Sequence, residues 1–98
     1  MALAKKGSRR ITVGGSDYRW LVSPQDIEGI GLFVEHAEEP AQRIVTWFEH
    51  GDIISPSVVA WTIKFALAHG WNPKATGSEM HFCHHGQIDG QFSRLARR

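Results

Sequence analysis

The sequence predicts a single α+β domain with a four- to five-stranded, mostly antiparallel sheet and one main helix, residues 56–69, packed on one face. Three observations lead to this fold class. Short apolar segments of alternating character recur before residue 50, one strongly capped helical segment follows, and another alternating segment comes after it. The predicted order of elements is therefore strand, strand, strand, strand, helix, strand.

Length and composition support one domain, because 98 residues with 42% hydrophobic content are enough for a single core. We expect a basic N-terminal arm over residues 1–8, the α+β domain over residues 9–85 and a C-terminal tail over residues 86–98. Three apolar residues of the tail have the spacing of one helix face and favour a short helix there, namely Ile88, Phe92 and Leu95.

Alternation of apolar and polar residues places the strands. The predicted strands are residues 10–13, 18–22, 30–37, 43–49 and 79–84. Gly14-Gly15-Ser16-Asp17 is typical of a tight turn and joins the first two strands as a hairpin. Residues 23–29, around Pro24, are expected to form a loop. The fourth strand is apolar on both faces, which indicates that it is central in the sheet or covered on both sides.

The helix carries start and stop signals at both ends. Ser55 is a favourable N-cap, and Pro56 occupies the first helical position, where its missing N–H does no harm. Gly70 can adopt the left-handed conformation that ends a helix, and Trp71 can then fold back on the last turn. Pro73 prevents continuation.

Apolar residues lie on two sides of this helix. The stripe that we assign to the sheet is Pro56, Val59, Ala60, Ile63, Ala66, Leu67 and Gly70. The opposite stripe is Val58, Trp61, Phe65 and Ala68. Leaving its two large aromatic side chains in water forgoes roughly 3–6 kcal/mol of burial, against a domain stability of about 5–15 kcal/mol. Something is therefore expected to cover this second stripe.

Two coverings are compatible with the sequence. The chain's own tail could fold over the helix, or another protein could dock there, most simply a second copy in a two-fold dimer. We adopt docking as the functional hypothesis: a small protein-interaction module that self-associates or binds a protein partner through Val58, Trp61, Phe65 and Ala68.

The alternative hypothesis is a small-ligand or metal-binding domain that uses the histidine-rich strand at residues 81–85. On a strand, His81, Cys83 and His85 share one face, and imidazole and thiolate are good zinc or copper ligands. Side chains at alternate positions of one strand diverge, however, so a tetrahedral site would need a further ligand from elsewhere in the fold.

No pattern in the sequence predicts an enzyme or a bound cofactor. His50 and Asp52 could form a pair in the loop before the helix, and Cys83 lies beside His84, but neighbouring residues of a strand point to opposite faces. The glycine pair Gly29 and Gly31 opens a strand rather than a helix, so it lacks the context of a nucleotide-binding loop.

Charge and cysteine content limit the other classes of partner. The net charge is +1, with basic ends and an acidic middle, which does not favour a surface that tracks nucleic acid. The single cysteine excludes an internal disulfide and fits a cytoplasmic protein. The longest nearly apolar stretch, residues 53–68, is too short and too polar to span a membrane.

Two stretches resemble a group of small, uncharacterised bacterial proteins. The first is Tyr18-Arg19-Trp20 with Val22-Ser23. The second is Ser55-Pro56-Ser57-Val58-Val59-Ala60, Ile63, Ala66-Leu67 and Gly70-Trp71-Asn72-Pro73. The resemblance implies a bacterial source and the same small α+β arrangement, and it brings no activity, cofactor or site residue with it.

Overall fold

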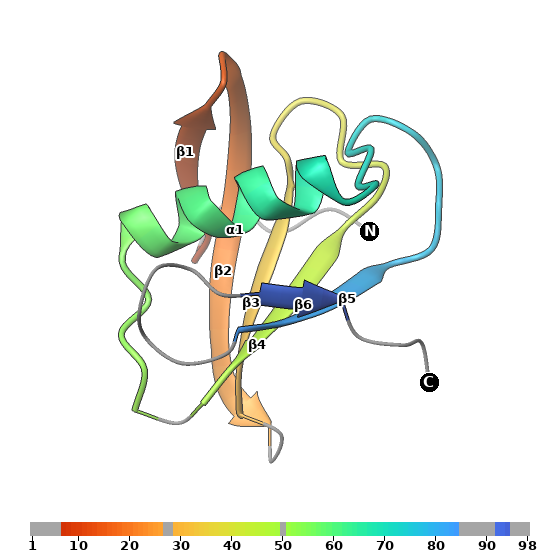
Figure 1. Cartoon of the computed structure of the whole chain (residues 1–98). Helices are drawn as coiled ribbons and strands as arrows, with labels where there is room; N and C mark the ends of the chain where they lie inside the picture. The colour runs from red at the N-terminus through yellow and green to blue at the C-terminus, as the bar shows by residue number, and fades with distance from the viewer. Residues whose placement is uncertain (1–6, 27–28, 50, 85–91, 95–98) are drawn as a thin grey trace.

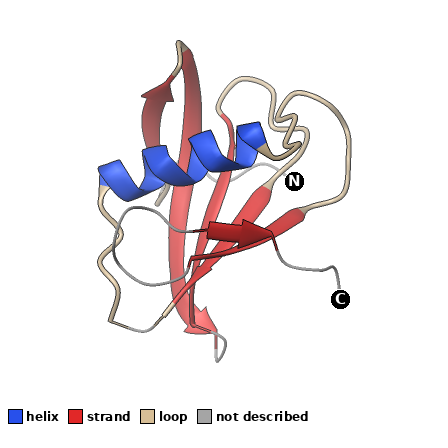
Figure 2. Ribbon diagram, viewed as in Figure 1, coloured by secondary structure: helices blue, strands red, loops and turns tan. Residues whose placement is uncertain are grey.

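The computed structural model describes residues 7–26, 29–49, 51–84 and 92–94 (Figure 1). Its elements are β1 (Arg9–Val13), β2 (Ser16–Asp26), β3 (Gly29–His36), β4 (Ile44–Phe48), α1 (Pro56–Ala68), β5 (Met80–His84) and β6 (Phe92–Arg94). The strands form one sheet in the order β1-β2-β3-β4-β5-β6, and α1 lies across one face of it (Figure 2). The predicted α+β class, with one main helix and a mostly antiparallel sheet, is confirmed.

One strand pair departs from the antiparallel pattern. Each strand runs antiparallel to its neighbour except β4 and β5, which are parallel. The connection between these two strands contains α1, since a parallel pair requires a crossover rather than a tight turn. β4 lies between β3 and β5, which is the first of the two positions that its apolar faces allowed.

The predicted loop over residues 23–29 is wrong for its first part, because β2 continues through Pro24 to Asp26. The pairing with β3 shifts register between Ser23 and Asp26. A bulge of this kind tolerates a proline within a strand, since the missing N–H then interrupts no regular ladder bond.

The short helix considered for the C-terminal tail is also wrong where the structure describes the tail. Residues 92–94 form β6, which pairs antiparallel with β5. Without β6 the outer edge of β5 would present unpaired backbone donors and acceptors, and pairing satisfies them. Ile88 and Leu95 lie outside the described residues.

The capping signals of α1 are confirmed. The Ser55 side chain accepts a hydrogen bond from the backbone N–H of Val58 at 3.4 Å. Gly70 has a φ of 100°, and the N–H of Trp71 donates to the carbonyl of Ala66 at 3.0 Å. This bond closes a Schellman-type end, which a non-glycine residue at position 70 would strain.

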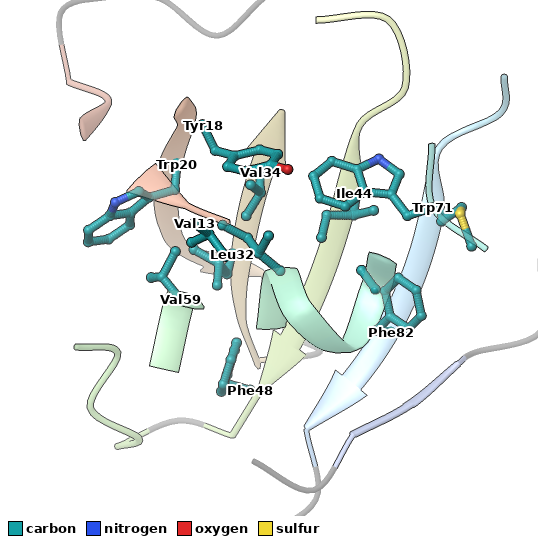
Figure 3. Close-up of a cluster of buried hydrophobic side chains, with 13 residues drawn as sticks. Val13, Tyr18, Trp20, Leu32, Val34, Ile44, Phe48, Val59, Trp71 and Phe82 are labelled. Carbon is teal, nitrogen blue, oxygen red and sulfur yellow. The ribbon is translucent and has the colours of Figure 1, made fainter. Parts of the chain in front are cut away.

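The hydrophobic core fills the space between the sheet and α1 (Figure 3). Its buried members are Val13, Tyr18, Trp20, Leu32, Val34, Ile44, Phe48, Val59, Ile63, Ala66, Trp71, Met80 and Phe82. Every strand from β1 to β5 contributes to it, so the sheet and the helix are held together by one continuous cluster.

The helix is rotated about its axis relative to the prediction. The residues it buries are Val59, Thr62, Ile63 and Ala66, whereas Leu67, assigned to the sheet, is 39% exposed. Thr62 can be buried because its hydroxyl donates to the carbonyl of Val58 at 2.8 Å, which satisfies its polarity within the helix.

Candidate functional site

The four residues predicted for docking divide into two pairs. Val58 and Phe65 are half-buried and pack against the core cluster. The ring of Phe65 meets Phe82 of β5 edge-on, with centroids 5.6 Å apart and an interplanar angle of 86°. The protein's own sheet therefore covers part of the stripe that the sequence predicts to face outward.

The second pair faces solvent. Trp61 is 42% exposed, and Ala68 is also exposed. The two residues are seven positions apart, which places them about two turns apart on the same side of the helix. We name the exposed residues Ser57, Trp61, Lys64 and Ala68 the Trp61 surface.

Exposed large apolar side chains are few in the described part of the chain, namely Ile53 at 85%, Trp61 at 42% and Leu67 at 39%. Leu67 lies on the side of the helix away from Trp61, and Ile53 precedes the helix. The helix itself contains no acidic residue, and its only charged side chain is Lys64. The Trp61 surface therefore combines the apolar side chains of Trp61 and Ala68 with the hydroxyl of Ser57 and the cation of Lys64.

Two of the predicted ligands, His81 and Cys83, alternate along β5 with the buried residues Met80, Phe82 and His84, so their side chains lie on the other face of the sheet. Both ring nitrogens of His81 have partners: Nε2 lies 3.1 Å from a carboxylate oxygen of Glu79, and Nδ1 accepts from Trp47 Nε1 at 3.4 Å. His85 lies outside the described residues. Within the described ranges, no group of three or more potential ligands comes together as a metal site.

Cys83 is half-buried, and its sulfur lies 4.0 Å from the backbone carbonyl oxygen of His84. Burial raises the pKa of the Cys83 thiol above its ordinary value, and the nearby charge of Glu49 raises it further. A raised pKa keeps the sulfur protonated at neutral pH, which opposes the nucleophilic role considered for it.

A cavity of about 310 Å³ lies where the crossover leaves β4 and enters α1. We name it the crossover cavity, and the residues that line it are Phe48, Gly51, Asp52, Ile53, Ser55, Val58 and His84. The ring of His84 stacks on Phe48 with centroids 4.8 Å apart. The cavity combines three apolar walls with a carboxylate, a hydroxyl and an imidazole.

The structure places Asp52 and His84 on the wall of the same cavity, an arrangement that the sequence did not predict. The predicted partner of Asp52, His50, lies outside the described residues. The carboxylate of Asp52 accepts a hydrogen bond from the backbone N–H of Glu49 at 3.0 Å, which fixes the loop. No spacing signal could have indicated the Asp52 and His84 combination, because it depends on the parallel pairing of β4 with β5.

Comparisons with known proteins give no relative: no family model matches the chain, and neither a curated protein nor a solved structure does. No helix within the described ranges has the length and apolar character needed to cross a membrane.

Proposed function

We propose that the protein is a small, non-enzymatic interaction module that self-associates as a two-fold dimer through the Trp61 surface. The observation that carries this proposal is the position of Trp61, 42% exposed, two turns from the small residue Ala68 on the same side of the helix. The half-buried thiol of Cys83, with its raised pKa, supports a non-catalytic role.

The large and small residues suit a pair of antiparallel helices. A two-fold axis midway between positions 61 and 68 sets Trp61 of each copy against Ala68 of the other, so both indoles find room at once. The same axis brings the half-buried Phe65 residues of the two copies near each other. The two Lys64 side chains lie on the other flank, where their flexible stems can carry the charges into water.

The expected dimer is weak. Full burial of an aromatic side chain stabilises by about 1.5–3 kcal/mol, and two indoles would contribute about twice that. Most or all of this gain offsets the cost of association, which is at least about 4 kcal/mol. The indoles alone leave a surplus of at most about 2 kcal/mol, so even with the other contacts of the interface the dimer is expected to be no tighter than about the millimolar range.

Light scattering over a range of protein concentrations tests the proposal. The wild-type mass is expected to rise towards that of a dimer, whereas Trp61→Asp stays monomeric. Leu67→Asp is the matched control, since Leu67 is similarly exposed but lies on another side of the helix. A wild-type mass that stays monomeric up to about 1 mM would refute self-association.

A residue exchange tests the antiparallel arrangement. Trp61→Ala removes the large partner and Ala68→Trp fills the space for it, so each single variant is expected to weaken the dimer. The double variant restores one large and one small residue in each copy, and dimer formation is expected to recover. Two weakened singles with no recovery would argue against this arrangement.

A further inference from the structure

We propose that His36 is a pH-sensitive catch: its neutral ring holds the loop between β3 and β4 closed, and protonation of its Nδ1 releases that loop. We name residues 37–43 the β3–β4 loop. The proposal concerns the end of β4 opposite the crossover cavity and stands independently of the dimer. It rests on two hydrogen bonds that only an unprotonated Nδ1 can accept.

The His36 ring is held inside the fold. His36 is the last residue of β3, lies on the same face of the sheet as Leu32 and Val34, and is 5% exposed. Its ring meets that of Tyr18 in β2 edge-on, with centroids 5.5 Å apart. The Tyr18 ring in turn lies 5.6 Å from that of Trp71 (Figure 3). The position of the imidazole is therefore fixed by neighbouring rings.

One atom of this ring closes the loop. The backbone N–H groups of Glu38 and Glu39 both donate to His36 Nδ1, each at 3.1 Å. An imidazole nitrogen accepts a hydrogen bond only while it carries no proton, so this arrangement requires the neutral tautomer with its proton on Nε2. Because two consecutive N–H groups converge on one nitrogen, the shape of the loop depends on the charge of one ring.

The closed loop holds two ion pairs to other parts of the fold. Glu38 lies 3.0 Å from Arg10 of β1, and Glu39 lies 3.9 Å from Lys74 in the segment after α1. Both pairs are exposed, and an exposed pair contributes little by itself. Their geometry therefore depends on the loop that carries the two carboxylates, and release of the loop is expected to loosen both pairs.

Protonation converts the acceptor into a donor. A proton on Nδ1 would point at the two N–H groups that now donate to it, so both hydrogen bonds would be lost. The Glu38 and Glu39 N–H groups would then have to reach water or another acceptor, because an unpaired buried donor is unfavourable. Moving the loop away from the ring allows this without disturbing the strands.

On the side of β2, the ring has one carboxyl and one hydroxyl nearby. Hydrogen bonds from Thr12 and Arg10 lower the pKa of Asp17, and the charge of His36 acts in the same direction. Burial raises the pKa of Tyr18, so its hydroxyl stays neutral while a histidine titrates. Asp17 is thus the charged group that an imidazolium would meet from this strand.

On the side of the loop, the nearby charges are Glu38 and Glu39, and their cations Arg10 and Lys74 are engaged in the ion pairs described above. A protonated ring would therefore lie among carboxylates, whereas the neutral ring accepts two backbone hydrogen bonds. Each charge state has its own set of partners, which is the requirement for a protonation switch.

An NMR titration of ¹⁵N-labelled protein from about pH 7.5 to about pH 4.5 tests the proposal, since histidine side chains titrate in this range. At the upper end, the ring ¹⁵N shifts of His36 are expected to show the Nε2–H tautomer. As the ring takes up a proton, the Glu38 and Glu39 amide protons are expected to move upfield with the same midpoint, because their hydrogen bonds are lost.

Two matched variants assign the response to one ring. His36→Asn places an amide oxygen where it can accept in place of Nδ1, and this oxygen does not titrate in the same range. The variant is expected to keep the loop closed and to abolish the shifts of the Glu38 and Glu39 amide protons. His69→Asn removes an exposed histidine at the end of α1 and is expected to leave these shifts unchanged.

The proposal is overturned by an Nδ1–H tautomer at the upper end of the titration, by a ring that stays neutral down to about pH 4.5, or by amide shifts that do not follow the ring. The same amide shifts in His36→Asn would also overturn it, as would loss of all native signals at once, which indicates global unfolding. If His36→Asn does not fold, the wild-type ring and amide titrations still decide. Trp61→Asp is expected to respond like the wild type, which separates the catch from the proposed dimer.

Discussion

The indole Nε1 of Trp71 donates a hydrogen bond of 2.9 Å to the backbone carbonyl of Gln42, joining the exit of α1 to the segment that enters β4. Two further contacts fix this junction. The N–H of Asn72 donates to the Gln42 side chain at 3.0 Å, and the Pro73 carbonyl accepts from the N–H groups of Ala41 and Gln42. The crossover is therefore anchored at the end opposite the cavity.

Trp71→Phe is expected to destabilise the protein by about 1–3 kcal/mol, because the ring is buried and the hydrogen bond to Gln42 is lost. Urea unfolding followed by circular dichroism measures the change. Gln42→Ala is the control, since it keeps the backbone acceptor and loses the two side-chain bonds, from the Asn72 N–H and to the Ser78 carbonyl, for an expected cost of about 0.5–1.5 kcal/mol each. Equal stability of Trp71→Phe and the wild type would contradict the assigned role.

Gly29→Ala is expected to destabilise the protein by more than about 3 kcal/mol or to prevent folding. Gly29 has a φ of 127°, and an added Cβ would overlap the backbone carbonyl of Phe48. Gly14→Ala provides the comparison, because Gly14 also has a positive φ, of 58°, but no atom lies within 4 Å of its added Cβ. That variant is expected to cost only about 1–2 kcal/mol. Similar unfolding midpoints for the two variants would refute the steric argument.

Because α1 is rotated relative to the sequence prediction, a charged residue is expected to have a large effect on stability at position 62 and a small one at position 67. Thr62→Asp is expected to destabilise by more than about 3 kcal/mol, since it places a charge at a position only 1% exposed. Leu67→Asp is expected to change stability by less than about 1 kcal/mol, because Leu67 is 39% exposed. Chemical denaturation of both variants measures the two changes in stability. A larger loss for Leu67→Asp than for Thr62→Asp would indicate that Leu67 faces the sheet, as the sequence predicted.

Local signals predicted the helix and most of the strands because each depends on nearby residues. Ser55, Pro56 and Gly70 act within one turn of their own positions, so their sequence pattern was sufficient. The rotation of the helix about its axis, in contrast, does not depend on nearby residues alone. Thr62 counts as polar in any pattern, yet its hydroxyl is satisfied by the helix backbone, and Phe65 is drawn inward by Phe82 of a later strand.

The candidate sites were predicted less completely than the fold. Sequence spacing identified Trp61 and Ala68 as outward residues, and the structure places both in solvent. It could not show that Phe65 would pack on the sheet, nor that Asp52 and His84 would line one cavity. Both relationships arise from the position of β5 beside β4, which is decided by pairing between distant segments.

Stability is expected to fall in acid partly through Asp17. The Thr12 hydroxyl and the Arg10 guanidinium lower the pKa of Asp17 below its ordinary value. A carboxyl whose pKa is lower in the folded state stabilises fully above its unfolded pKa, and this contribution disappears as pH falls through the folded pKa. The loss is therefore expected below about pH 4.

Urea unfolding between about pH 2 and pH 5 measures this effect. The wild type is expected to lose stability more steeply below about pH 4 than Asp17→Asn, which cannot titrate at this position. Added salt is expected to reduce the share of this stabilisation that comes from Arg10, because the Arg10–Asp17 ion pair is exposed. The share that comes from the Thr12 hydrogen bond is expected to remain. Parallel pH profiles for the two proteins would exclude a contribution from Asp17.

Cys83 is expected to react slowly with iodoacetamide. Burial and the charge of Glu49 raise the pKa of its thiol, so at neutral pH the thiolate fraction is smaller than in a free cysteine. The alkylation rate, followed by mass spectrometry, is expected to be below that of an unstructured cysteine peptide at pH 7 and to keep rising above pH 9. Glu49→Gln removes the second cause and is expected to increase the rate modestly, whereas Glu39→Gln is expected to leave it unchanged. Alkylation faster than the peptide at pH 7 would instead indicate an activated thiol and reopen a nucleophilic role for this strand.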